Sequence, residues 1–535
     1  MSERIASVLR GAERAVLRCK AQIREAARRY RATFLCAFCA GLAAYGFAML
    51  NILNNQDNLA NTPGGYGYGV TSGRWFLEAL AHFVRAVWGT DTLPLFNGLL
   101  SITFVALTAC LTSYALDIQS RRFSVLIGVL LVTFPSLGMT MLFMFTVGYY
   151  MFALLLTLIG VCAAKRFDGP AGIALPTLFF TLSLGIYQAY LPVAAALFLL
   201  ILIRQGFSDD ALSGVKLFLR GLRFLSSLIL SLACYLLIVR WTVSANGAAL
   251  NSYQEISQMG TVSVSEIPDM MAAAYQKFFA LASRAEYAIN NAPLNRFAFL
   301  TSMILSALAF VWLVWRGQAA KPLKALNAVF LILFPAASFG IILMCYHSDI
   351  FGRMTYGAAT LFFLPMVLLE CAERDVSNDT QRILRNGAAF LLSAILVLTS
   401  AHYIWQSNEN YMALYYTNRQ TEHYFASMAT RIRMTAGYRQ DLPLALIGAN
   451  ISDGAFSNDI YRKIFWRYGG YAEHSNYKKA GRSYMYSYLG FHQPTAPDEK
   501  VSELSDWPEV RDMPCYPDDG SIRIIDGYII VKLEN

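Results

Sequence analysis

The stretch that decides the fold class is FSVLIGVLLVTFPSLGMTMLFMFTVGYYMFALLLTLIGVCA (residues 123–163), which contains no Asp, Glu, Lys, Arg or His. A helix needs about 20 apolar residues to cross the hydrocarbon core of a bilayer. The stretch is long enough for two crossings, with Pro135 at a possible break between or within them. It therefore predicts helical membrane spans rather than a soluble enzyme.

The rest of the chain repeats this pattern. Of its 535 residues, 56% are hydrophobic and only 15% are charged, whereas soluble domains carry about 25% charged residues. We predict a polytopic α-helical membrane protein with about eleven transmembrane helices. The predicted spans are 32–53, 92–116, 123–141, 145–163, 171–186, 189–204, 222–243, 297–315, 325–345, 355–372 and 386–405. The four from 123 to 204 are short, and Pro135, Pro176 and Pro192 mark places where they tilt or break.

The positions of Lys and Arg predict the orientation, since cytoplasmic loops are enriched in both. With residues 1–31 inside, nine Lys and Arg lie in that tail and fourteen in the five inside loops. The outside loops hold far fewer, among them Arg74, Arg85, Lys277, Arg284 and Arg353. The net charge of +9 is thus a property of the cytoplasmic loops, and we predict no nucleic-acid partner.

Three regions follow. Residues 1–31 form a basic amphipathic helix on the cytoplasmic leaflet, preferred over a signal peptide because no small-residue cleavage site follows span one. Residues 32–405 form the transmembrane domain, with a first outer loop at 54–91. Residues 406–535 form a small exported α/β domain, with a helix at 406–436 and strand-like runs at Leu444–Ile447 and Ile522–Leu533.

The distribution of polar residues favours an enzyme over a transporter. Transporters and pumps place ionisable residues inside their spans, whereas Asp117, Arg240 and Glu370 lie close to span ends here. Long polar loops on the outer face suit an enzyme at the membrane surface. A flippase or transporter for a lipid-linked glycan remains the alternative.

The first outer loop contains the candidate catalytic base, Asp57. It is the only acid between span one and Glu78, and it lies a few residues beyond the span. A carboxylate at that depth can accept a proton from a hydroxyl at the bilayer surface. The alternative is that Asp57 caps a helix or closes a turn.

The same loop continues with a Gly/Tyr run, Gly64 to Gly69, and an amphipathic segment at 72–88. Tyr66, Tyr68 and Trp75 are candidates for stacking on sugar rings, or else belong to a flexible loop and an interfacial helix. Arg74 follows Gly73 at the start of this helix, where it is well placed to hold an anionic ligand.

Four features in this order resemble the Gtr type II glucosyltransferases, which convert the serotype of bacterial O-antigen. They are the single acid after span one, Ser72-Gly73-Arg74-Trp75, Gly185-Ile186-Tyr187-Gln188-Ala189-Tyr190, and Arg353 in a short outer loop. The closing Met513–Pro517, Asp519–Ser521 and Ile529–Leu533 also look like the C-terminus of that family. The resemblance covers nearly the whole chain.

The resemblance implies a GT-C type fold in the bacterial inner membrane, with the C-terminal domain in the periplasm. It implies transfer of a hexose, with glucose expected, from a polyprenyl-phosphate donor to O-antigen or a related surface glycan. A flippase and a polyprenyl-phosphate sugar synthase would be functional partners. Family members often carry paired acids in the first outer loop, but this chain has Gln56-Asp57, which places the whole catalytic role on Asp57.

One carboxylate suffices for an inverting transfer in which Asp57 is the base. The leaving phosphate needs cationic stabilisation, for which Arg353 is the first candidate and Arg74 the second. Tyr187, Gln188, His347 and Asp349 are candidates for binding sugar or acceptor. The alternatives are structural: an interfacial anchor or an Asp349 pair for Arg353, an interfacial role for His347, and satisfaction of exposed backbone by Gln188.

The tyrosine-rich stretch from Tyr461 to Tyr488 is a candidate binding surface for an acceptor glycan, or else a solvated surface. No metal site or cofactor is predicted, although a divalent metal is compatible with the chemistry. A GT-C enzyme that glycosylates a protein is a further alternative.

Overall fold

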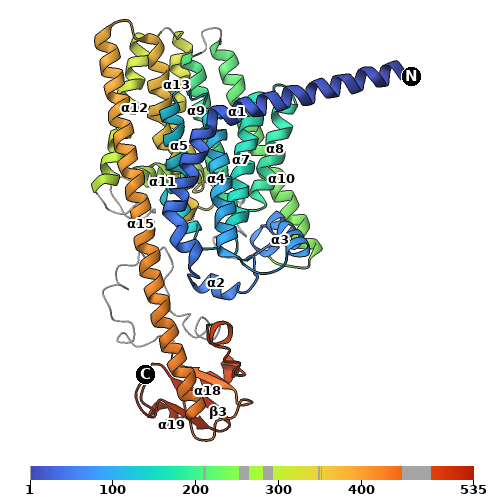
Figure 1. Cartoon of the computed structure of the whole chain (residues 1–535), viewed down its shortest axis with the longest axis vertical. Helices are drawn as coiled ribbons and strands as arrows, with labels where there is room; N and C mark the ends of the chain where they lie inside the picture. The colour runs from blue at the N-terminus through green and yellow to red at the C-terminus, as the bar shows by residue number, and fades with distance from the viewer. Residues whose placement is uncertain are drawn as a thin grey trace.

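The computed structural model describes residues 2–208, 212–251, 264–280, 293–317, 319–346, 350, 352–448 and 484–534, without the side chains of 2–23, Gln56 and Asp375. It shows an elongated helical bundle, from which one helix continues into a smaller domain at the C-terminus (Figure 1). The helices of the bundle and its loops are α1 (Ser2–Leu50), α2 (Gln56–Ala60), α3 (Trp75–Trp88), α4 (Pro94–Ala115), α5 (Arg121–Thr133), α6 (Pro135–Thr140), α7 (Val147–Arg166), α8 (Ala171–Leu184), α9 (Leu191–Ser208), α10 (Gly214–Ala245), α11 (Ile267–Ala280), α12 (Pro293–Arg316), α13 (Lys321–Ser338), α14 (Phe363–Ala372) and α15 (Asp379–Met434). The C-terminal domain adds β1 (Leu444–Ile447), α18 (Asp498–Ser505), α19 (Pro508–Arg511), β2 (Ile522–Ile525) and β3 (Tyr528–Lys532).

Within the described residues, eight helices are long and apolar enough to cross a membrane. They are α1 from Arg24, α4, α5 with α6, α7, α9 with its preceding turn, α10, α12 and α15. Two shorter apolar helices, Ala171–Leu184 and Tyr356–Ala372, and α13 occupy the other three predicted spans. The chain is therefore a polytopic helical membrane protein, while the count of eleven crossings stays a prediction.

The prolines act differently from one another. Phe134 has an extended backbone (ψ 134°) that ends α5, and Pro135 then begins α6. This is the expected geometry, because proline disfavours the helical conformation in the residue before it and is well suited to a first turn. Pro192 likewise lies in the first turn of α9, whereas α8 continues through Pro176, so the chain does not break there and a tilt at Pro176 stays a prediction.

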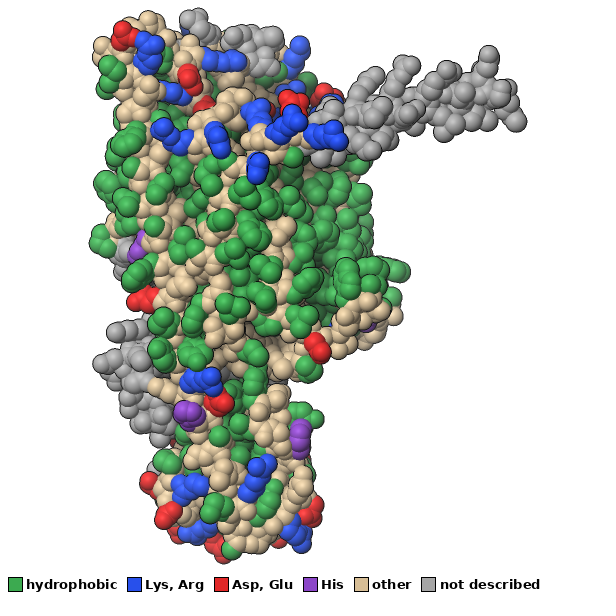
Figure 2. Space-filling view, viewed as in Figure 1, with side chains coloured by type: hydrophobic (Ala, Val, Ile, Leu, Met, Phe, Trp, Pro, Cys, Tyr) green, Lys and Arg blue, Asp and Glu red, His purple; other side chains and the backbone are tan. Residues whose placement is uncertain are grey.

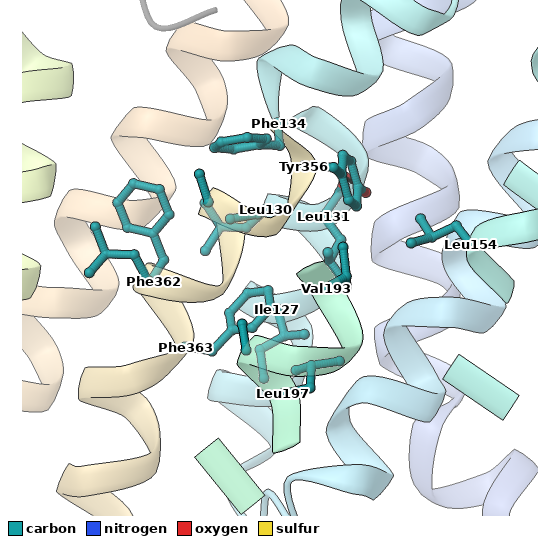
Figure 3. Close-up of a cluster of buried hydrophobic side chains, with 14 of the residues drawn as sticks. Ile127, Leu130, Leu131, Phe134, Leu154, Val193, Leu197, Tyr356, Phe362 and Phe363 are labelled. Carbon is teal, nitrogen blue, oxygen red and sulfur yellow. Dashed lines mark hydrogen bonds between the residues drawn. The ribbon is translucent and has the colours of Figure 1, made fainter. Parts of the chain in front are cut away.

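The core of the bundle surrounds α5, whose apolar side chains are buried on nearly all sides (Figure 3). Leu130 and Leu131 lie beside Val193 of α9 and Phe363 of α14 in this cluster. The phenol of Tyr356 donates a hydrogen bond to the backbone oxygen of Leu131. A helix that is hydrophobic all round is the sequence signature of such a central position.

The outer surface of the bundle is apolar across its middle and charged at one end (Figure 2). Exposed apolar residues recur at helical spacing, as in Leu222, Leu225 and Ile229 of α10 and Leu300, Ile304 and Leu308 of α12. An exposed belt of this kind is the face that lipid covers. Lys and Arg are concentrated at the end where α1 leaves the bundle, which we call the basic end.

In the described residues of the C-terminal domain, a three-stranded sheet lies between two helical layers. Its strand order is β1-β3-β2, with β1 parallel and β2 antiparallel to β3. Phe425, Met428 and Ile432 at the end of α15 pack in one apolar cluster with strand residues. Leu504 of α18 and Val510 of α19 belong to the cluster on the other face, with Ile530.

The sheet differs from the predicted strands in one place. β1 occupies the predicted residues, but the predicted run Ile522–Leu533 is divided into β2 and β3. The dividing residues, Asp526 and Gly527, both have positive φ (49° and 75°). Asp-Gly with two positive φ values is the preferred two-residue hairpin turn.

Candidate active site

Asp57 lies in the first turn of α2, the short helix that follows the first membrane helix. The N-cap of α2 is Asn55, whose side-chain oxygen accepts a hydrogen bond from the backbone of Asn58 (2.8 Å). Asp57 is therefore not the capping residue. Its side chain is exposed, and no hydrogen bond or ion pair within the described residues engages its carboxylate. That carboxylate is available to a substrate.

Two asparagines fix the position of α2. Asn58 donates through Nδ2 to the backbone oxygens of Leu53 (2.8 Å) and Leu142 (2.7 Å). The backbone of Asn54 exchanges two hydrogen bonds with the side chain of Asn418 on α15 (2.5 and 3.0 Å). The loop is thus bound both to the bundle and to the helix that leads into the C-terminal domain.

A cavity of about 170 Å³ lies beside this loop. Asn54, Asn58 and Asp91 are polar residues of its lining, and Tyr488 of the C-terminal domain lines it as well. The Tyr488 phenol donates to Oδ1 of Asn54 (2.8 Å), and burial raises its pKa, so that it remains a neutral donor. Oδ1 of Asn58 is buried and has no partner within the described part of the chain. Most of the lining is apolar, and Asp57 itself is not a lining residue. An apolar cavity with a few polar groups is typical of a small-molecule site.

Arg353 approaches the same region from a different part of the chain. It lies in the 3₁₀ turn Gly352–Met354, with its guanidinium carbon 5.1 Å from the centroid of the Phe143 ring. Phe143 follows Leu142, the residue whose carbonyl holds Asn58. The loop between α6 and α7 therefore connects Arg353 with the helix that bears Asp57.

Arg74 lies in a second cluster, where it contacts two tyrosines. It donates a hydrogen bond to the hydroxyl of Tyr150 (2.8 Å), and its guanidinium carbon is 5.6 Å and 5.7 Å from the Tyr150 and Tyr187 ring centroids. The two rings stack at 4.3 Å. Nε of Arg74 is buried without a partner within the described residues. An arginine held against aromatic rings in this way retains donors for an anion.

Gln188 joins two motifs that are more than a hundred residues apart. Its Nε2 donates to the backbone oxygen of Ser72 (3.1 Å) and to the hydroxyl of Tyr235 on α10 (2.9 Å). Between them, Gly73 has a φ of +68°, and a Cβ there would lie 2.4 Å from that hydroxyl. Only glycine fits this position. The Gln188 amide thus binds the backbone of the buried Ser72, and a role of Gln188 toward sugar or acceptor stays a prediction.

The start of α3 is held by Gly185. The backbone N–H groups of Phe76 and Leu77 both donate to the Gly185 oxygen (2.9 and 3.1 Å), which satisfies donors that a helix start leaves open. The Trp75 indole packs so closely that a Cβ on Gly185 would lie 2.7 Å from it. The position of Trp75 indicates packing between the two motifs rather than a surface open to sugar.

The Gly/Tyr run is ordered by charged residues of α3. Arg85 lies over the Tyr66 ring (5.0 Å) and donates to the Gly64 oxygen, and Glu78 accepts from the backbone of Val70 (2.8 Å). Burial, and then the charge of Glu78, raise the pKa of Tyr66, which therefore stays protonated. Tyr68 is 65% exposed and is the residue of this run that remains open to a ligand.

The structure thus arranges the predicted residues in two groups, Asp57 with Arg353 around the α6–α7 loop, and Arg74 with Tyr187 and Gln188 against α7 and α10. His347, Asp349 and residues 461–483 of the tyrosine-rich stretch lie outside the described residues.

The sequence prediction missed Phe143, Tyr150 and Tyr235, which contact the two arginines and Gln188. The sequence feature that could have identified Tyr150 and Tyr235 is their position in apolar spans, where a buried tyrosine hydroxyl usually has a hydrogen-bond partner.

An apolar helical bundle with a carboxylate, two arginines and a small cavity at one end defines a polytopic membrane protein with a candidate site at that end. Comparison with known proteins gives the family: the model of the glucosyl transferase GtrII family matches residues 46–366. The chain belongs to this family, and it is a membrane glycosyltransferase whose reaction requires a sugar donor and a glycan acceptor. No curated protein and no solved structure matches the chain.

The matched range includes both groups of the candidate site. It ends before α15, so the match does not include the C-terminal domain or the closing segments 513–517 and 519–521. The resemblance that the sequence suggested is confirmed for the bundle.

Proposed function

We propose that this glycosyltransferase moves a hexose, with glucose as the expected sugar, from a polyprenyl-phosphate donor to O-antigen or a related surface glycan. The reaction takes place on the periplasmic face of the bacterial inner membrane, in a GT-C type bundle, and inverts the anomeric configuration. The observation that carries the proposal is the exposed Asp57 carboxylate, which has no partner within the described residues and lies next to Asn58, a lining residue of a small cavity, in a glucosyltransferase family member.

The chemistry follows from these groups. Asp57 takes the proton of the acceptor hydroxyl as its oxygen attacks the anomeric carbon. The bond between that carbon and the phosphate oxygen breaks, and the electron pair leaves with the polyprenyl phosphate. This phosphate is a stable anion and requires no general acid, but it does require a cation close to the departing oxygen.

Arg353 is the residue that we assign to the phosphate. It is connected to the Asp57 helix through Phe143 and Leu142, so one loop positions the base and the cation. Guanidinium matches phosphate with two parallel hydrogen bonds. Arg74 is the second phosphate candidate, and its contacts with Tyr150 and Tyr187 support a role in the wall of the donor site.

The orientation rests on charge. In Figures 1 and 2, α2 and the C-terminal domain lie away from the basic end of the bundle. The positive-inside rule assigns the basic end to the cytoplasm and therefore the Asp57 side to the periplasm. A lipid-linked donor agrees with this side, and a flippase and a cytoplasmic synthase would supply it.

The test is transfer in vitro by the purified full chain, with polyprenyl-phosphate glucose and isolated O-antigen lipid. Asp57→Asn should lower the transfer rate by about 10²- to 10⁴-fold, the usual contribution of a general base, and should leave donor binding intact. The matched control is Asp269→Asn, because Asp269 is also an exposed aspartate in the first turn of a helix.

Wild-type transfer by Asp57→Asn would remove the catalytic assignment. Equal losses in both variants would indicate a general effect of removing surface charge. Transfer to a protein acceptor but not to the O-antigen lipid would overturn the proposed substrate class.

A further inference from the structure

A groove of about 870 Å³ opens at the basic end of the bundle, far from the candidate active site. It lies between α1, from Glu25 to Leu35, and the last turns of α4, from Leu107 to Tyr114. Arg166, the last residue of α7, completes it. Figure 1 shows that α1 turns away from the bundle at this end, so the groove lies where that helix leaves.

The floor of the groove is apolar. Phe34 and Leu35 of α1 line it together with Leu107 and Leu111 of α4. Leu35 and Leu107 are 46% and 40% exposed in segments that are apolar enough to cross a membrane. Exposed leucines of a membrane-spanning segment are covered by lipid chains rather than by water.

The rim of the groove is positively charged. Arg29, Arg31 and Arg166 line it, against a single acid, Glu25. Arg29 already has hydrogen-bond partners in the bundle, because it donates to the backbone oxygen of Ile118 (3.1 Å) and to the side chain of Gln119 (2.8 Å). Arg31 and Arg166 make no ion pair within the described part of the chain, and both side chains are exposed. The neighbouring Lys165 is paired with Asp117 (2.6 Å).

We propose that this groove binds one anionic two-chain phospholipid of the leaflet at the basic end. The phosphate contacts Arg31 and Arg166, and an acyl chain covers Phe34, Leu35, Leu107 and Leu111. The charge of the groove indicates the headgroup, because two arginines without carboxylate partners in the described residues favour a negatively charged lipid over a zwitterionic one. Basic pockets between membrane helices are also typical sites for anionic headgroups. The proposal is independent of the transfer reaction.

The experiment uses the full chain in nanodiscs that contain phosphatidylglycerol and phosphatidylcholine in equal amounts, with retained lipid counted by native mass spectrometry. The wild type should retain one phosphatidylglycerol in preference to phosphatidylcholine. Arg31→Ala with Arg166→Ala should weaken its retention by roughly 30-fold, about fivefold for each cation near the headgroup. The control, Arg316→Ala with Arg382→Ala, removes the same charge from exposed sites elsewhere and should retain the lipid as the wild type does.

A second variant keeps the proposal testable if the double arginine variant does not fold. Leu107→Trp fills the groove and leaves the arginines in place, so it should also release the lipid. Three outcomes would overturn the proposal: equal retention of both lipids by the wild type, equal losses in the two double variants, or preferential retention of added polyprenyl phosphate over phosphatidylglycerol.

Discussion

The two ends of the helical bundle use charged residues in different ways. At the basic end, arginines and a lysine form ion pairs with carboxylates: Lys165–Asp117, Arg204–Glu370, Arg223–Asp168, Arg385–Glu373 and Arg382–Asp379. At the end that bears the candidate active site, Arg74 and Arg353 lie against aromatic rings. The carboxylate of Asp57 has no partner within the described residues.

The difference separates charges held in ion pairs between helices from arginines held against aromatic rings. An ion pair consumes the hydrogen-bonding capacity of both partners. An aromatic ring contacts the face of a guanidinium and leaves its N–H edge open to phosphate. The comparison predicts that substitutions in a buried ion pair of the basic end alter stability, and that substitutions at the site end alter transfer.

The largest effect is expected for Glu370→Ala at the basic end. Glu370 is 8% exposed, pairs with Arg204 (3.0 Å), and accepts from the backbone N–H groups of Gln119 and Ser120. Its loss leaves a buried arginine without its partner, at a cost of about 3–5 kcal/mol. The apparent Tm in detergent should fall strongly, and by less in Glu370→Gln, which keeps an acceptor. A wild-type Tm combined with lost transfer would place Glu370 in the reaction instead.

The next effect is expected at the site end, in Arg353→Ala. Losing a charge-assisted contact with phosphate costs about 1.5–3 kcal/mol, which corresponds to a roughly 10- to 100-fold higher KM for the donor. The control is Arg419→Ala, because Arg419 also lies over an aromatic ring (5.4 Å from the Tyr415 centroid) and is not one of the candidate site residues. A higher KM for the acceptor alone would contradict the phosphate assignment.

A smaller effect is expected for Tyr150→Phe, which keeps the stacked ring and removes the hydroxyl that Arg74 contacts. One hydrogen bond is worth about 0.5–1.5 kcal/mol, so kcat/KM should fall by roughly twofold to tenfold while Tm is preserved. Tyr149→Phe, at the neighbouring position, should leave transfer unchanged. Equal rates for Tyr150→Phe and the wild type would show that Arg74 needs only the rings.

The smallest effect is expected for Arg382→Ala at the basic end. Arg382 and Asp379 are both highly exposed and lie one turn apart on α15. Such surface pairs contribute about 0.2–1 kcal/mol, so neither Tm nor transfer should change appreciably. A large loss of stability in Arg382→Ala would show that an exposed ion pair of the basic end stabilises the fold as strongly as a buried one. Burial would then not explain the effect expected for Glu370→Ala.

Much of the fold could be predicted from local sequence. The apolar runs, the break at Pro135, the long helix α15 and strand β1 depend on hydrophobicity and backbone preferences, which neighbouring residues determine. The single predicted strand at 522–533 was wrong because Asp526-Gly527 forms a hairpin turn within an otherwise strand-like run.

The candidate site could be predicted only as separate pieces. Asp57, Arg74, Gln188 and Arg353 were identified one by one, but nothing in the sequence placed Gln188 against Ser72, or Arg353 above Phe143. Tyr150, Tyr235 and Phe143 were missed because an aromatic residue in an apolar span looks like ordinary core until its polar neighbour is known.

The sequence by itself determined that this is a helical membrane protein, which of its ends is basic, and the residue types of its chemistry, since these depend on composition and short-range order. The tertiary structure alone decided which charges form ion pairs with each other and which aromatic rings hold the arginines. The physical reason is that helices contact one another through residues that are far apart in the chain. The sequence of an apolar span does not show which of its sides packs against which neighbouring helix.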